Sequence, residues 1–304
     1  MISKNFSGFL RLLEKGVSTG KQVYGVFGNP VSHSLSPFMH NEAFRMKNMN
    51  ALYLPFEVPV NELQQCLKMV SEAGISGLNI TIPLKEAVVQ HLDDLSPEVK
   101  KTGSANTISF RNGRLKGDNT DIDGFLRPLK QYAEPIKYES AVVFGSGGSA
   151  RAVLFALLRN YNFPYIYLIA RDREKADKLL DEAELWKKGQ TFLEYRDFKK
   201  STAAADAIWE SRLLVNCTPL GMKSVKTPFP SDITRFFRPG QIFYDLIYNP
   251  LRTPILIEGE RHGGLTISGL SMFVEQGAKS FRIWTGKVMP RKKIYEILKD
   301  RLAE

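Results

Sequence analysis

The chain has 304 residues, which is enough for about two domains of ordinary size. Hydrophobic residues make up 43% of it and charged residues 24%, so the composition is that of a globular protein and excludes a disordered or collagen-like chain. The net charge of +10 comes from basic residues scattered along the chain. We therefore expect a solvated basic surface that favours small anionic ligands, with no nucleic-acid partner.

Cysteine usage and hydropathy indicate the compartment. The only two cysteines, Cys66 and Cys217, fall in a predicted helix and at a predicted strand end, which favours a reducing compartment without structural disulfides. No apolar run approaches the roughly 20 residues that cross a bilayer, and residues 1–16 lack the apolar core of a signal peptide. The four histidines have no ligand spacing. We expect a cytoplasmic protein with no membrane partner and no metal site.

The first half of the chain alternates strand and helix patterns. Strands are expected at 22–27, 52–57, 78–82 and 105–110, and helices at 37–46, 61–73, 84–92 and 121–132. Pro37 suits the first helical turn, and we expect Ser36 to cap that helix. The Asn112-Gly113 pair predicts a hairpin turn, with a return through Leu115. The order βαβαβ predicts a parallel or mixed sheet.

The second half begins after a short polar linker, Ala133–Tyr138. Strands are expected at 142–144, 165–169, 213–216 and 242–246, and helices at 152–158, 174–186, 269–285 and 290–302. This alternation predicts a second α/β unit with a parallel sheet.

A glycine-rich turn joins the strand at 142–144 to the helix that follows it. Gly145, Gly147, Gly148 and Ala150 remove side chains where backbone would approach a pyrophosphate, in the G-x-G-x-x-A spacing of dinucleotide-binding turns. Such turns also occur in methyltransferases and in sheets that bind nothing. The strand–turn–helix context favours a nucleotide site, and a turn that only packs the helix on the sheet stays open.

Polar residues stand at the ends of several predicted strands, where a parallel sheet is normally apolar. They are Asn79, Thr81 and Lys85; Ser104, Asn106 and Thr107; and the segment 117–121. Each set has a local interpretation, in which the polar groups cap backbone or begin a helix. A lysine and an aspartate from separate strand-end loops can also hold a substrate hydroxyl and exchange a proton with it.

Eight segments occur in the order seen in shikimate dehydrogenases, which the chain resembles over nearly its whole length. They are VFGNPVSHSLSP (26–37), NITIPLKE (79–86), SANT (104–107), GDNTD (117–121), VFGSGGSAR (143–151), VNCTPLGM (215–222), YDLIYNP (244–250) and SGLSMFVEQGA (268–278).

The resemblance implies an α/β protein of two domains. A mixed-sheet substrate domain would comprise residues 1–125, joined by C-terminal helices at 271–304 that return to it, and a Rossmann dinucleotide-binding domain would comprise residues 126–270. The site is expected between them. The family reduces 3-dehydroshikimate to shikimate, usually with NADPH, in chorismate and aromatic amino-acid biosynthesis. A monomer or a homodimer is expected.

Site residues follow from the positions that match the family motifs. The resemblance implies that Ser34, Ser36 and Tyr248 hold the substrate carboxylate, that Thr81, Asn106 and Gln276 bind the ring hydroxyls, and that Lys85 and Asp121 are the catalytic pair. Asn79 is expected to be structural, and helix capping stays an alternative role for Ser36. We expect Lys85 to give the proton in the reduction while Asp121 keeps it charged. In the alternative, Asp121 mediates the transfer and Lys85 only stabilises charge.

The cofactor side is implied in the same way. The expected binding positions are Gly145, Ser146, Gly147, Gly148, Ser149, Ala150, Arg171, Lys175, Asn216, Thr218, Gly221, Met222, Gly269 and Met272.

The choice between NADP and NAD depends on the end of the second Rossmann strand. Arg171 and Lys175 favour NADP, whose extra phosphate attracts basic residues, whereas Asp172 resembles relatives that oxidise quinate or shikimate with NAD. We expect NADP, with Asp172 buried as a helix cap. Ser268 replaces the usual aspartate before Gly269. The alternatives are a quinate/shikimate dehydrogenase that uses NAD or both cofactors, and a non-catalytic relative that senses shikimate-like acids.

Overall fold

The computed structural model describes residues 4–198, 201–222 and 231–303. The chain divides into two compact units, one of residues 1–120 and 276–294 and the other of residues 121–275 and 295–304. This division places residues 276–294 with the N-terminal half and residues 295–304 with the second unit. The exact domain boundaries expected from the sequence stay a prediction. No helix among the described residues is long and apolar enough to span a bilayer.

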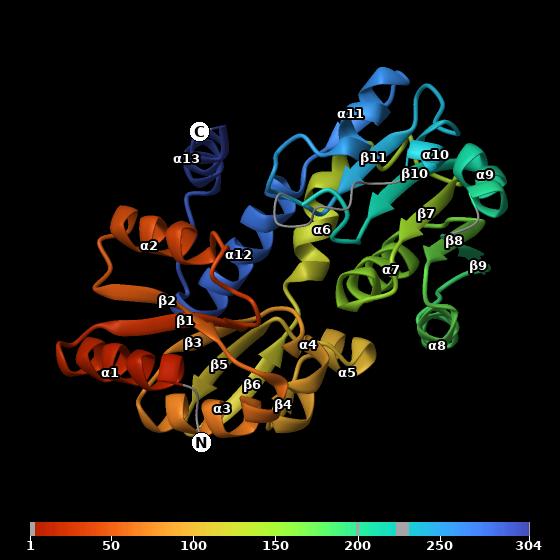
Figure 1. The fold of residues 1–304 in the computed structure, drawn as a ribbon. Helices are drawn as coiled ribbons and strands as arrows, with labels where there is room; N and C mark the ends of the chain where they lie inside the picture. Colours follow the sequence, from red (N-terminus) through yellow and green to blue (C-terminus); the bar gives the residue numbers. More distant parts are fainter. Residues whose placement is uncertain (1–3, 199–200, 223–230, 304) are drawn as a thin grey trace. The chain divides into compact units, whose positions relative to one another are not determined.

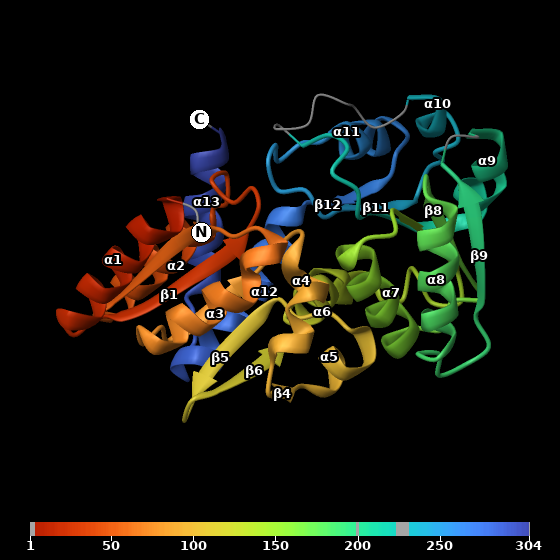
Figure 2. The ribbon, with the colours of Figure 1, turned by 60° about the horizontal axis from the view of Figure 1, so that its bottom comes forward.

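The first unit is built on a mixed six-stranded sheet in the order β2-β1-β3-β5-β6-β4. Its strands are β1 (Gln22–Gly28), β2 (Ala51–Glu57), β3 (Gly77–Ile80), β4 (Asp94–Leu95), β5 (Thr107–Arg111) and β6 (Arg114–Asp118). Strands β2, β1 and β3 are parallel, whereas β5 is antiparallel to both β3 and β6. Figure 2 shows the β5–β6 hairpin. Asn112 and Gly113 both have positive φ, which confirms the predicted hairpin turn.

Helices cover both faces of this sheet. They are α1 (Lys4–Ser18), α2 (Ser36–Met46), α3 (Leu63–Glu72), α4 (Leu84–Ala87), α5 (Pro97–Thr102) and the later part of α12 (Gly269–Thr285). Successive residues of β1 point to opposite faces. Val23 joins a core cluster with Leu13 of α1, whereas the Tyr24 ring lies 5.1 Å from the ring of Phe44 in α2 and 5.2 Å from that of Trp284 in α12.

The expected helix at 84–92 is wrong in length. The structure has the short α4 and then a single 3-10 turn at Val89–His91. The β-branched pair Val88 and Val89 lies where the α-helix stops, and such side chains lose rotamer freedom in a helix. Lys85 therefore lies on a tight turn close to the end of β3.

The second unit is a fully parallel six-stranded sheet in the order β12-β11-β10-β7-β8-β9. Its strands are β7 (Ser140–Phe144), β8 (Tyr165–Ala170), β9 (Phe192–Asp197), β10 (Ser211–Asn216), β11 (Ile242–Asp245) and β12 (Leu265–Ile267). Its helices are α6 (Asp121–Leu129), α7 (Gly148–Asn160), α8 (Arg173–Glu184), α9 (Ser201–Glu210), α10 (Ser231–Thr234), α11 (Pro254–Arg261) and the later part of α13 (Arg291–Ala303). Figure 1 shows α7 and α8 on one face of this sheet and α9 to α11 on the other. The two sheets confirm the expected fold class.

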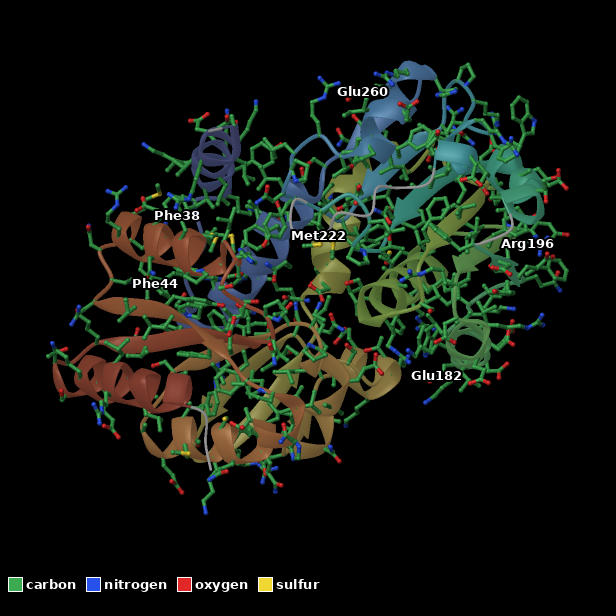
Figure 3. All side chains as sticks on the ribbon, in the orientation of Figure 1. Phe38, Phe44, Glu182, Arg196, Met222 and Glu260 are labelled. Atoms are coloured by element: carbon green, nitrogen blue, oxygen red, sulfur yellow. The ribbon has the colours of Figure 1, made fainter. Side chains whose placement is uncertain are left out.

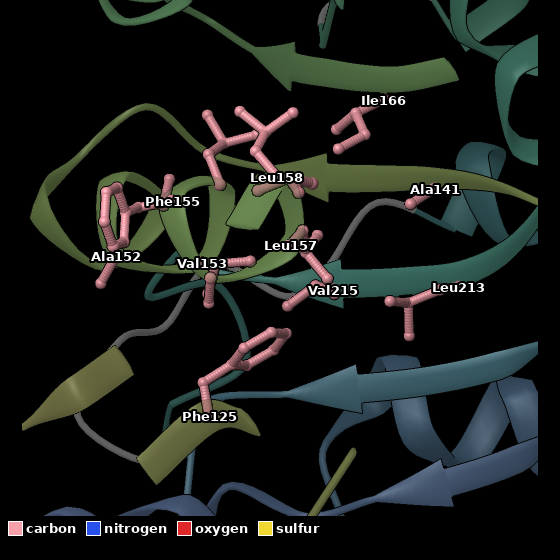
Figure 4. Close-up of a cluster of buried hydrophobic side chains, with 14 of the residues drawn as sticks. Phe125, Ala141, Ala152, Val153, Phe155, Leu157, Leu158, Ile166, Leu213 and Val215 are labelled. Atoms are coloured by element: carbon pink, nitrogen blue, oxygen red, sulfur yellow. The ribbon is translucent and has the colours of Figure 1, made fainter. Parts of the chain in front are cut away.

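Each face of the parallel sheet has its own core. Val143 belongs to a cluster with Leu154 of α7 and Phe125 of α6, whereas Val142 belongs to the cluster under α9 to α11. Figure 4 shows Phe125, Leu157 and Val215 of the first cluster. Arg151 on α7 is 9% exposed and forms an ion pair with Glu182 on α8 (Figure 3). These contacts fix α7 on the sheet and so fix the direction of its first turn.

Candidate functional site

Ser34 and Ser36 lie at the beginning of α2. The helix has Leu35 as its N-cap residue, with no side-chain cap bond, and Ser36 N donates to Ser34 Oγ at 3.2 Å. The expected cap by Ser36 is therefore wrong, because the neighbouring Ser34 accepts the amide hydrogen. Ser36 is buried near Tyr53, whose pKa is raised well above its usual value by burial and lowered in part by the Ser36 side chain.

Thr81 and Lys85 follow β3 along a short turn. Thr81 lies just past the strand end, where its N–H donates to Phe27 O at 2.8 Å and its carbonyl accepts from Leu84 N at 2.9 Å. Lys85 is half-buried, and its carbonyl accepts from Ala105 N at 2.9 Å. The turn that carries Lys85 is thus attached to the segment that carries Asn106.

Asn106 is held by a buried hydrogen-bond network in which both ends of its amide take part. Its Oδ1 accepts from Thr120 N at 2.7 Å and lies 3.1 Å from Thr107 Oγ1, and its Nδ2 donates to Thr120 Oγ1 at 2.9 Å. All three residues are at most 3% exposed. The amide orientation is therefore fixed by neighbours from two segments.

Asn79 connects this network to Tyr53 of β2. Its Oδ1 accepts from the Tyr53 hydroxyl at 2.7 Å, and its Nδ2 donates to Asn106 O at 3.0 Å and to Thr107 Oγ1 at 3.1 Å. These contacts give Asn79 the structural role expected from the sequence.

Two aspartates lie around Thr120. Asp118 ends β6, is half-buried, and has its pKa raised by burial. Asp121 is the first residue of α6 and is 7% exposed.

The glycine turn of the second unit has the backbone that dinucleotide binding needs. Gly145 has φ of +103°, and an added Cβ would lie 3.1 Å from Thr218 Cγ2. A Cβ at Gly147 would meet nothing within 4 Å, and Gly147 begins α7 without a side-chain cap bond. The N-cap residue of this 13-residue helix is thus a glycine with free space around it. A helix N-terminus of this kind, with unpaired N–H groups in its first turn, suits a pyrophosphate. These residues fit a dinucleotide.

The end of β8 carries the residues expected to choose the cofactor. Asp172 is the N-cap residue of α8, where its Oδ1 accepts from Lys175 N at 3.1 Å and its Oδ2 lies 3.4 Å from Lys175 Nζ. The backbone hydrogen bond from Lys175 lowers the pKa of Asp172. The expectation of a buried cap is wrong in one respect, because the Asp172 side chain is 47% exposed. Arg171 beside it is also exposed.

Asn216 and Thr218 form a rigid turn at the end of β10. Asn216 is fully buried, and its Oδ1 accepts from Thr218 N at 3.0 Å and Thr218 Oγ1 at 2.7 Å. Its Nδ2 donates at 3.0 Å to Asp245 Oδ1, at the end of β11. Asp245 also accepts from Ile247 N at 3.0 Å and Thr253 Oγ1 at 2.5 Å. The buried Asn216 side chain therefore fixes the conformation of this turn through its hydrogen bonds to Thr218 and Asp245.

Asp245 is a buried carboxyl group with a raised pKa. It is fully buried, and burial raises its pKa from 3.8 to about 7, against the hydrogen bonds from Thr253, Ile247 and Asn216, which lower it. Burial, and after it the charge of Asp245, raises the pKa of the Cys217 thiol. Three neutral donors thus hold a carboxyl group whose pKa is well above its ordinary value.

The remaining expected residues of this unit lie around β11 and the beginning of α12. Gly221 has φ of +97°, and a Cβ at Gly269 would lie 2.3 Å from Leu246 O, so each position requires glycine. Met222 is 37% exposed (Figure 3), whereas Met272 is 7% exposed. The Tyr248 ring stacks on Phe273, with 4.4 Å between centroids.

Sequence reasoning missed two residues that organise these groups. Ser280 lies one turn after Gln276, and its hydroxyl contacts the Asn106 network. Asp245 stands in a strand that is otherwise apolar, a pattern that signals a buried polar role.

Comparisons with known proteins identify the family. A sequence profile described as "Shikimate dehydrogenase substrate binding domain" matches residues 26–108, and one described as "Shikimate 5'-dehydrogenase C-terminal domain" matches residues 269–299. The shikimate dehydrogenase (NADP(+)) of Prosthecochloris aestuarii is 39% identical over 288 residues, which cover 93% of this chain and 98% of that protein.

Two solved structures have the same fold over most of their length. Shikimate 5-dehydrogenase from Thermus thermophilus, in complex with NADP(H) and shikimate, matches with a TM-score of 0.78 and 35% identity, covering 92% of this chain and 99% of that one. The Listeria monocytogenes enzyme, in complex with shikimate and NAD, matches with a TM-score of 0.81 and 32% identity, covering 92% and 96%. With both profiles and a relative matched nearly end to end, this chain belongs to the shikimate dehydrogenase family.

Proposed function

We propose that the protein catalyses the reversible NADPH-dependent reduction of 3-dehydroshikimate to shikimate. The observation that carries the proposal is the match over 93% of the chain to a shikimate dehydrogenase (NADP(+)). The geometry of each unit supports it, with a fixed polar network in the first and an open glycine turn in the second. The cytoplasmic location and the monomeric or homodimeric state expected from the sequence are part of this proposal.

The second unit would hold the cofactor. The backbone from Gly145 to Ala150 would bind the pyrophosphate at the beginning of α7, and Arg171 and Lys175 would bind the 2′-phosphate. The turn of Thr218, the nearby Gly221 and the start of α12 would lie beside the nicotinamide. When bound, NADPH supplies the hydride that reduces the ring carbonyl.

The first unit would hold the substrate. Ser34 and Ser36 would bind the carboxylate together with Tyr248. Hydroxyl donors at the beginning of α2 suit an anion, because the positive end of the helix dipole adds to them. The ring hydroxyls would be bound by Thr81, Asn106 and Gln276.

Lys85 and Asp121 would carry out the proton transfer that accompanies reduction of the carbonyl. As the carbonyl is reduced, charge develops on its oxygen, and the Lys85 ammonium can stabilise that charge and give the oxygen a proton. The Asp121 carboxylate would orient that ammonium group. In the alternative that stays open, Asp121 mediates the transfer and Lys85 supplies only charge.

The test is a steady-state assay of shikimate and quinate, each with NADP+ and with NAD+, followed by the absorbance of the reduced nicotinamide. We expect the highest kcat/KM for shikimate with NADP+. A non-catalytic sensor would show binding without turnover. A clear preference for NAD+ or quinate would favour the second candidate, a quinate/shikimate dehydrogenase, which the carboxylate of Asp172 beside Arg171 makes worth testing.

Arg171→Ala is expected to lower kcat/KM for NADP+ by about tenfold to a hundredfold, because a charge-assisted bond to phosphate contributes about 1.5–3 kcal/mol. The kcat/KM for NAD+ should change little. Arg173→Ala is the matched control, because Arg173 lies two residues further along the chain but pairs with Asp177 and stacks over Tyr195. Equal losses with both cofactors would exclude a phosphate-binding role for Arg171.

Asp172→Asn is expected to leave the ratio of kcat/KM values for NADP+ and NAD+ within about threefold of the original, since asparagine caps a helix as well as aspartate does. The Asp172 carboxylate accepts the Lys175 amide hydrogen, which makes it a cap in the free protein. A strong rise in the preference for NADP+ would contradict this and show that the carboxylate takes part in cofactor choice.

A further inference from the structure

Ser280 on α12 connects four segments of the first unit through one hydroxyl. The residue is fully buried. Its Oγ lies 2.8 Å from Thr107 Oγ1, 3.1 Å from Thr120 Oγ1 and 3.1 Å from Asn79 Nδ2, which donates to it. It also donates at 3.1 Å to the carbonyl of Gln276, one turn earlier on the helix.

The hydroxyl groups around Ser280 must share their protons. Each hydroxyl has one hydrogen to donate and two lone pairs that accept. If one hydroxyl is removed, the hydroxyl that was bonded to it can rotate and change its own partners. Thr107 Oγ1 and Thr120 Oγ1 each lie within hydrogen-bond distance of Ser280 Oγ and, at 3.1 Å, of Asn106 Oδ1, and each can donate its single hydrogen to only one of the two. The groups that hold the Asn106 amide are therefore the groups that Ser280 holds.

We propose that Ser280 is a positioning residue for substrate binding, because its hydroxyl fixes the amide of Asn106 and joins the Gln276 turn of α12 to it. The inference rests on the proposed function, in which Asn106 and Gln276 bind ring hydroxyls. An amide side chain presents a hydrogen-bond acceptor at one end and donors at the other. If the Asn106 amide rotated, it would offer the wrong group to the substrate hydroxyl that it binds in its native orientation. Ser280 thus sets the pattern of donors and acceptors that the ring meets.

Ser280→Ala tests the proposal in a steady-state assay. We expect the KM for shikimate to rise about tenfold, kcat to change less than about threefold, and the KM for NADP+ to stay unchanged, as misplacement of one substrate-binding amide predicts. Thr285→Val is the matched control on the same helix, because Thr285 Oγ1 donates at 2.7 Å to Phe281 O, within α12 itself. We expect this control to lower Tm without raising either KM.

A shikimate analogue that lacks one ring hydroxyl gives a readout that a purely structural role would not move. For the hydroxyl that Asn106 or Gln276 binds, the loss in kcat/KM caused by Ser280→Ala should be smaller with the analogue than with shikimate, because the misplaced contact is already absent. Equal losses with shikimate and with each of the analogues that keep the reacting hydroxyl would overturn the proposal.

The possible results distinguish a failure of the proposed dehydrogenase function from a failure of the positioning role of Ser280. If the unmodified protein does not oxidise shikimate, the proposed function fails. If it does, and Ser280→Ala lowers Tm while the KM for shikimate stays unchanged, the positioning role fails and the function stands. Should Ser280→Ala not fold, Ser280→Cys replaces it, since it keeps a similar volume and only a weak donor. An unchanged KM for shikimate in that variant also overturns the proposal.

Discussion

Lys85→Met is expected to lower kcat for shikimate oxidation by about a hundredfold to ten-thousandfold, the usual contribution of a positioned acid or base. Methionine keeps the length of the side chain but has no charge and no proton to exchange. Because Lys85 sits on the short turn after β3, whose backbone is held by Ala105 N, we expect the fold and the KM for shikimate to change much less than kcat. Steady-state kinetics and a Tm measurement check both parts.

The control for this variant is Lys100→Met, which removes an exposed lysine of the same unit and should leave kcat unchanged. Near-normal turnover in Lys85→Met would remove Lys85 from the mechanism. Asp121→Asn then separates the two proposed roles. If Lys85 gives the proton, Asp121→Asn should lower kcat less than Lys85→Met does; a larger loss in Asp121→Asn would assign the transfer to Asp121.

The contribution of the buried Asp245 to the stability of the protein is expected to fall between pH 4 and pH 7. Its pKa is raised from 3.8 to about 7 in the folded protein, so the folded state holds this proton more tightly than the unfolded chain. Stability from this group is therefore fully present below about pH 4 and is lost as the pH rises through about 7. One pKa unit corresponds to about 1.4 kcal/mol, so the change amounts to roughly 4 kcal/mol at most.

Asp245→Asn isolates this contribution. The amide can still accept from Asn216 and Ile247 through its oxygen, and it can donate to Thr253 Oγ1 as the protonated acid would. We measure the free energy of unfolding in urea for this variant and for the unmodified protein. Between pH 4 and pH 8 we expect the difference, variant minus unmodified protein, to increase by several kcal/mol, up to about 4.

Asp172→Asn serves as the control with the opposite sign. The pKa of Asp172 is lowered, so its stabilising effect is present above the ordinary value and is lost as the pH falls. Parallel curves of unfolding free energy against pH for Asp245→Asn and the unmodified protein would show that Asp245 has an ordinary pKa.

Local patterns were enough to predict several elements. The apolar run before Gly145 forms β7, the glycines begin α7, and Asn112-Gly113 forms the turn between β5 and β6. Each of these depends on neighbours within a few residues. The length of α4 was predicted wrongly, because the apolar pattern continues past Ala87 while the β-branched valines after it disfavour the helix.

The sequence by itself determined the α/β class, the dinucleotide-binding turn and, through the order of its motifs, the family. Only the tertiary structure decided how the polar residues are used. Ser280 meets Asn79, Thr107 and Thr120 across 201, 173 and 160 residues of sequence, and Asn216 meets Asp245 across 29. Whether a polar side chain caps a local helix or joins a buried network depends on which distant donors and acceptors folding brings to it, and no local pattern records those partners.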